Sequence, residues 1–114
     1  MREDRERLND ILEAITKIEK YATRGENVFK RNELVQTWII HYLSIIGEAV
    51  GALSDDLREQ HPSVPWSKIT GMRNIIVHNY FGIETKIVWS VVKKNLPPLK
   101  REVNMMLREM KKKK

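Results

Sequence analysis

The side chains best suited to chemistry are gathered in one short segment, from 71 to 82. Five polar side chains occur there within eight positions of an otherwise apolar stretch: Arg73, Asn74, His78, Asn79 and Tyr80. A histidine titrates near neutral pH, so it can accept a proton from a ribose 2′-hydroxyl or give one to a leaving 5′-oxygen. A planar guanidinium can hold two phosphate oxygens and stabilise the charge of the transition state. Arg73 and His78 therefore suit cleavage of an RNA phosphodiester bond without a metal ion.

The spacing of these residues limits how they can meet. Successive residues on a helix turn by about 100°, so Asn74 and His78 are neighbours one turn apart, whereas Arg73 and His78 are about 140° apart. Either the helix unwinds before His78, or two chains share a cleft to which one gives the arginine and the other the histidine. Asn74 could orient the imidazole or a phosphate oxygen. Tyr80 could stack on a base, donate a hydrogen bond or carry a modification.

The spacing of Arg73 and His78 also has a structural reading, because Arg and His at a helix end often only cap the helix or face solvent. Other enzyme signatures are missing. The five glycines form no phosphate loop, the three histidines show no metal-ligand spacing, and no serine lies in a nucleophile elbow. The absence of cysteine excludes disulfides and thiol nucleophiles. No metal and no cofactor are predicted.

Apolar residues recur every three or four positions along most of the chain, which predicts amphipathic helices. The first ends near Thr23–Glu26, where Gly25 could terminate it. The others are expected from about Asn32 to about Gln60 with a short lead-in at Asn27–Phe29, from Trp66 to a loosening near Asn79–Gly82, from about Glu84 to about Asn95, and after Pro97-Pro98. The fourth is expected to bury Ile87, Val88, Val91 and Val92.

No segment alternates with a period of two, so the predicted fold class is all-α, an antiparallel bundle of four or five helices. One domain is expected over residues 1–110, followed by a basic tail at 111–114 that supplies four of the six net positive charges. Such a charge balance is compatible with RNA but does not demonstrate it. With no signal peptide and no apolar run of about 20 residues, a soluble cytoplasmic protein with no membrane contact is expected.

Beyond the polar segment, several residue patterns match a known family in order and spacing. They are Ile45-Ile46-Gly47-Glu48-Ala49, Val64-Pro65-Trp66, Arg73-x4-His78-x-Tyr80, Val88-Trp89 and Leu96-Pro97. Together they resemble the HEPN-domain proteins of the HepT type, over nearly the whole chain. One departure is Asn79, since an aspartate commonly precedes the motif tyrosine in that family.

The resemblance implies a helical-bundle ribonuclease toxin that forms a homodimer, with the motifs of both chains facing one cleft. Arg73 and His78 would be the catalytic pair, and Asn74 a supporting polar residue. The antitoxin partner implied is a minimal nucleotidyltransferase (MNT), which transfers AMP from ATP to Tyr80. Added bulk and negative charge would then occupy the place of the RNA phosphate.

Two other functions stay open at this point. One is a non-catalytic nucleotide- or RNA-binding HEPN module that partners a nucleotidyltransferase, and the other is a purely structural dimerising bundle. Glu48 could pair with Arg73 or orient His78, or it could be an ordinary surface carboxylate. His41 is expected to be partly buried and His61 to be an exposed loop residue. The three tryptophans are expected in the core or an interface.

Overall fold

The computed structural model describes residues 3–71 and 85–112, and every regular element in these two ranges is helical. The α-helices are α1 (Asp4–Ala22), α2 (Glu26–Arg31), α3 (Glu33–Gly51), α4 (Asp55–Gln60), α6 (Thr85–Ser90) and α7 (Leu96–Lys112). Between α6 and α7 lies a π-helical segment, η1 (Val91–Asn95), and a further helical turn covers 66–71. The predicted all-α class is confirmed for the described part of the chain.

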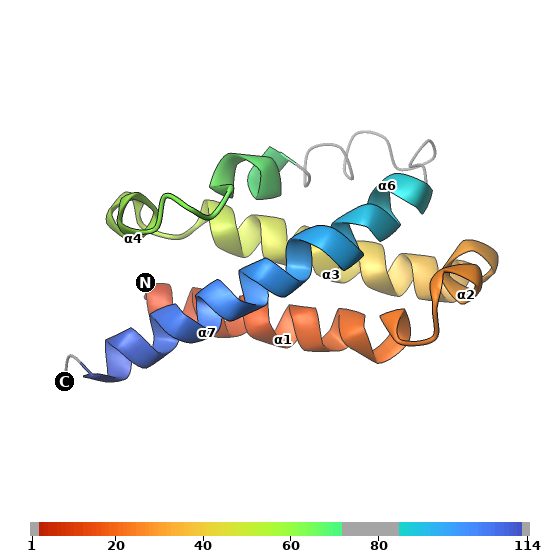
Figure 1. The fold of residues 1–114 in the computed structure, drawn as a ribbon, viewed down its shortest axis with the longest axis horizontal. Coiled ribbons are helices and arrows are strands. Elements are labelled where there is room, and N and C mark those ends of the chain that lie inside the picture. Colours follow the sequence, from red (N-terminus) through yellow and green to blue (C-terminus); the bar gives the residue numbers. More distant parts are fainter. Residues whose placement is uncertain (1–2, 72–84, 113–114) are drawn as a thin grey trace.

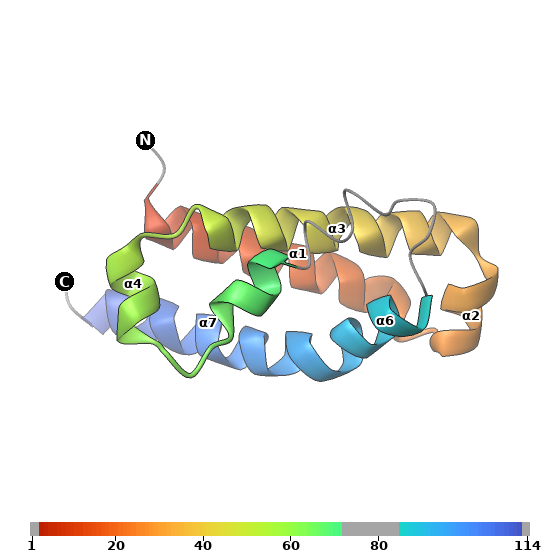
Figure 2. The ribbon, with the colours of Figure 1, turned by 90° about the horizontal axis from the view of Figure 1, so that it is seen from above.

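The long helices lie side by side in an elongated molecule, 47 Å long and 27 by 26 Å across. α1 runs in one direction, and both α3 and α7 run back in the other, as Figures 1 and 2 show from two sides. α1 packs most extensively against α3 and then against α7. The apolar stripe of α1 fills the space between them, with Leu8, Ile11 and Ile18 fully buried.

The predicted second helix is wrong in its length. It ends at Gly51, and α4 begins anew at Asp55. The Ser54 hydroxyl caps α4 by accepting a hydrogen bond from the Leu57 N–H at 3.2 Å, and it donates one to Asp4 Oδ2 at 2.6 Å. Apolar periodicity continues through Leu53, which is buried, so it does not reveal the break. A serine followed by two aspartates is a typical helix start and marks it better.

The break predicted at Pro97-Pro98 is also wrong, since the chain stays helical from α6 through α7. A proline ring inside a regular helix collides with the carbonyl four residues earlier. In η1 the helix widens, and the Leu96 N–H bonds to the Val91 carbonyl five residues back. The prolines then occupy the first turn of α7, where a missing N–H costs little.

Ile87 is another exception, because it is 53% exposed rather than part of the core. Val88 and Val92 are buried and Val91 is half-buried, as expected of this segment.

Two histidines exchange their predicted environments. His41 is exposed, whereas the side chain of His61 is only 14% exposed, with Nε2 3.9 Å from Glu109 Oε2. His61 therefore lies beside α7, a neighbour that its loop position does not predict.

Candidate active site

The predicted catalytic and supporting residues Arg73, Asn74, His78 and Tyr80 lie outside the described residues. The structure therefore bears on the site through what precedes and follows 72–84. On one side stands the helical turn over 66–71, and on the other stands α6, which begins at Thr85. A tryptophan fixes each of these flanking elements to the body of the protein.

Trp66 anchors the turn that leads toward Arg73. Its ring is buried, and its indole N–H donates to the Arg58 carbonyl at 3.1 Å and to the His61 carbonyl at 3.0 Å. These two carbonyls belong to the end of α4, and each also accepts a backbone N–H, that of Arg58 from His61 at 3.2 Å and that of His61 from Val64 at 3.3 Å. The Thr70 hydroxyl donates to the Trp66 carbonyl at 2.7 Å, and Ile69 is buried. The helical turn that ends at Gly71 is therefore held against the end of α4 by Trp66.

Trp89 anchors the element that follows. Its ring stacks on Phe29 of α2, with centroids 5.5 Å apart and planes 30° apart. Phe29 is itself 1% exposed, so this contact joins α6 to a fully packed part of the core. Aromatic pairs of this kind add about 0.5–1.5 kcal/mol beyond burial. The expectation that the tryptophans belong to the core rather than to a base-stacking surface is confirmed for Trp66 and fits the half-buried Trp89.

Glu48, the one predicted supporting residue inside the described ranges, is an exposed residue of α3. It stands one turn before Gly51, so the two share one side of the helix. At Gly51 a Cβ atom would lie 3.6 Å from the Thr70 methyl group, which shows how near α3 passes to the 66–71 turn. Glu48 is therefore on the side of α3 that faces this turn. Its partnership with Arg73 or His78 stays a prediction.

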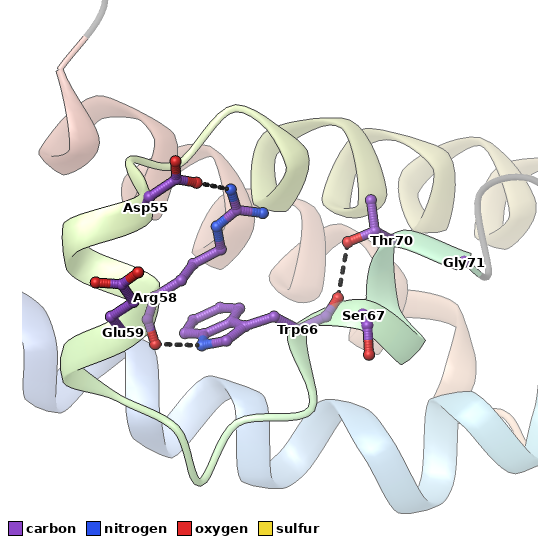
Figure 3. A pocket seen from close by; sticks show the side chains of 7 residues that line it. All are labelled: Asp55, Arg58, Glu59, Trp66, Ser67, Thr70 and Gly71. Carbon is purple, nitrogen blue, oxygen red and sulfur yellow. Dashed lines mark hydrogen bonds and ion pairs between the residues drawn. The ribbon is translucent and has the colours of Figure 1, made fainter.

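A hollow of about 600 Å³ opens beside the 66–71 turn, and the sequence did not predict it. Figure 3 shows its lining, which comes from α4 and from the turn: Asp55, Arg58, Glu59, Trp66, Ser67, Thr70 and Gly71. The Arg58 guanidinium reaches across it and pairs with Asp55 at 2.6 Å. Asp55 and Arg58 stand three apart on one helix, the spacing of an ion pair, and this was the only signal in the sequence.

The hollow borders the predicted site along the chain, since Gly71 lies two residues before Arg73. It offers one guanidinium, already paired, and two carboxylates, together with hydroxyl groups of the turn.

Within 3–71 and 85–112, no three His, Cys, Asp or Glu side chains are placed to share a metal ion. Over the same ranges, no helix has the length and apolar character needed to cross a membrane.

Comparison with known proteins identifies the family of the chain. The profile of the ribonuclease HepT-like family matches residues 11–106, so the chain belongs to that family. A candidate RNase of Methanocaldococcus jannaschii is 38% identical over 86% of this chain and 91% of its own length. A candidate ribonuclease HepT of Thermococcus cleftensis is 35% identical over 87% of this chain and 91% of its own length. No solved structure matches the chain significantly.

Proposed function

We propose that this protein is a metal-independent endoribonuclease that cleaves RNA through Arg73 and His78, as the toxin of a type II toxin–antitoxin pair. The observation that carries the proposal is the match to the ribonuclease HepT-like family over residues 11–106, a span that contains both side chains. Membership of a ribonuclease family makes RNA the substrate class. The residue types then supply a chemical route that needs no metal.

In the proposed reaction the ribose 2′-oxygen attacks the neighbouring phosphorus as the bond to the 5′-oxygen breaks. The 2′-hydroxyl loses its proton and the leaving 5′-oxygen gains one, and His78 carries out one of these transfers. Arg73 stabilises the negative charge on the phosphate oxygens at the transition state. The products are a 2′,3′-cyclic phosphate and a 5′-hydroxyl. The supporting residues are Asn74, Tyr80 and Glu48. Asn74 and Glu48 orient the imidazole or the guanidinium.

The test is incubation of the purified protein with total cellular RNA in excess EDTA, followed by analysis of the new ends. We expect cleavage products that carry 2′,3′-cyclic phosphate and 5′-hydroxyl ends. A substrate with a 2′-deoxyribose at a cleaved position should resist cutting there, because it has no nucleophile. Intact RNA after exposure to unmodified protein would contradict the proposal and favour the non-catalytic HEPN module as a partner of a nucleotidyltransferase.

The active protein is proposed to be a homodimer in which the two motifs face one cleft. Two exposed apolar side chains support an interface between copies, namely Leu34 at 80% and Ile87 at 53% exposure. Leu34 lies in the first turn of α3 and Ile87 lies in α6, and both helices contact α2. The two side chains therefore lie toward one end of the molecule. Apolar groups of this size are stabilised when a second chain covers them.

An MNT-type nucleotidyltransferase is the proposed antitoxin, and Tyr80 is the proposed acceptor of AMP. The phosphate of the adduct would repel the RNA backbone, and its bulk would block the strand. A Tyr80→Phe variant has no acceptor oxygen, so its RNA cleavage should continue when ATP and the transferase are added. Wild-type cleavage should stop under the same conditions, with the added mass located at Tyr80 by mass spectrometry. Equal silencing of both proteins would exclude Tyr80 as the acceptor.

A further inference from the structure

The positive charge of this protein is concentrated in its C-terminal helical segment. From 85 to 112 the chain carries eight Lys and Arg against two Glu, whereas 3–71 carries nine Lys and Arg against twelve Asp and Glu. The two parts therefore have opposite net charge. An anionic partner is attracted to the side of the molecule on which α6, η1 and α7 lie.

Within this segment, four cations form a line that we call the basic ridge: Lys94, Arg101, Arg108 and Lys112. Their spacing of seven, seven and four residues keeps them on one side of a helix, and the three in α7 fall within about 40° of one another. All four are exposed, and among the described residues no ion pair includes any of them. The ridge is not used by the fold.

The charged residues next to the ridge differ from it in their positions and partners. Lys100 lies about 100° from Arg101 around the helix, toward α1, where its Nζ is 2.9 Å from Glu19 Oε1. Lys93 and Lys111 lie beside one edge of the ridge, and the only two acidic residues of 85–112, Glu102 and Glu109, lie beside the other. The line is therefore positive along its length and negative along one border. A linear polyanion fits this pattern better than a compact one.

The dimensions match the backbone of a nucleic acid. At 1.5 Å per residue, cations seven residues apart are about 10 Å apart, and the whole ridge is about 27 Å long. In a duplex each strand carries one phosphate per about 3.4 Å of helix axis, so a ridge laid along that axis is as long as about eight phosphates of one strand. A membrane surface is a poorer fit, because the apolar face of α7 is buried in the core as Leu96, Leu99, Val103 and Met106.

We propose that the basic ridge binds the phosphate backbone of the RNA substrate outside the reacting nucleotides, without reading its sequence. The inference rests on the proposed function for the identity of the strand. It adds a second contact region, on α7 and η1, to a site whose chemistry is carried by 72–84. The ridge would hold long RNA by counterion release, while a very short RNA would not reach it.

The experiment compares two triple variants, each of which loses three exposed cations. The ridge variant carries Lys94→Gln, Arg101→Gln and Arg108→Gln, and the control carries Arg5→Gln, Lys20→Gln and Arg31→Gln. Both are made in a His78→Ala background, so that the strand is not cut. Affinity for a labelled single-stranded RNA is measured against salt concentration. The slope of log K against log salt is negative, and its magnitude should fall by about 2 in the ridge variant, at about 0.7 per lost contact. In the control the slope should stay unchanged.

Equal slopes for the two variants would overturn the proposal. It would also be overturned if the ridge substitutions abolished capture by phosphatidylserine vesicles while RNA binding kept its salt dependence. With His78 restored, the ridge variant should cleave a dinucleotide as the wild type does and a long RNA more slowly. If no protein cuts RNA but the slopes differ as expected, the ribonuclease proposal fails and the ridge stands.

Discussion

Replacing His78 by Ala is expected to decrease kcat/KM for RNA cleavage by about 10²–10⁴-fold, the usual contribution of a positioned acid–base group. Arg73→Ala should cost about 10²–10³-fold, because it removes charge stabilisation at the transition state. If both side chains face solvent, neither substitution should change the free energy of unfolding by more than about 0.5 kcal/mol. Activity on a labelled RNA in EDTA, with the denaturation midpoint of each variant as the control, measures these effects.

Mixing the two inactive variants tests how the catalytic pair is assembled. If one chain gives the arginine and its partner the histidine, a dimer of one Arg73→Ala chain and one His78→Ala chain has one intact site and one doubly damaged site. Refolding an equal mixture then yields mixed dimers as about half of the total, and activity returns to roughly a quarter of the wild-type level.

If each site uses an arginine and a histidine of the same chain, every site in the mixture carries a defect and no activity returns. That result would favour the other arrangement, in which the helix unwinds before His78. Refolding each variant alone gives the baseline. The measurement therefore separates the two geometries left open by the separation of about 140° between these positions on a regular helix.

Local patterns predicted much of the fold because the physics that forms a helix is local. The apolar spacing of α1, the stop before Gly25 and the new start at Trp66 all follow from side chains a few positions apart. Gly25 has a φ of +97°, a conformation that favours glycine, and it is the N-cap residue of α2, two residues after the C-cap of α1 at Thr23. Such signals need no knowledge of distant contacts.

The errors arose where two local signals competed or where a distant segment decided the outcome. At Leu53 the apolar period favoured continuing a helix, and the cap at Ser54 prevailed. At Pro97 the expected break is absorbed by the wider turns of η1, which apolar periodicity does not predict. His61 lies beside Glu109 of α7, a residue far away in sequence, so local patterns do not predict this neighbour.

The candidate site shows the same division. Residue types and family resemblance pointed to Arg73 and His78 without any tertiary information, because the chemistry of RNA cleavage narrows the choice of side chains. The hollow between α4 and the 66–71 turn was not predictable, because it depends on how two segments pack. The same holds for Trp66, whose apolar position was recognised but whose two backbone acceptors were not.

Trp66→Ala is the substitution expected to destabilise the described structure most, by about 3–5 kcal/mol. It removes a buried ring and leaves the Arg58 and His61 carbonyls without the indole N–H. Trp66→Phe keeps most of the packing, and both carbonyls keep a backbone N–H donor, so a smaller cost of about 0.5–1.5 kcal/mol is expected. Urea denaturation at a fixed protein concentration measures both free energies of unfolding.

Trp38→Phe is the matched control, since the Trp38 indole N–H also donates to a backbone carbonyl, that of Lys17, at 2.6 Å. Trp38 joins α3 to α1, and its ring also packs against Tyr21 and Tyr42. At a temperature where all variants are folded, Trp66→Phe should decrease RNA cleavage more than Trp38→Phe does, because it loosens the anchor of the turn that leads to the motif. Equal losses would mean that Trp66 contributes to stability alone and does not position the catalytic segment.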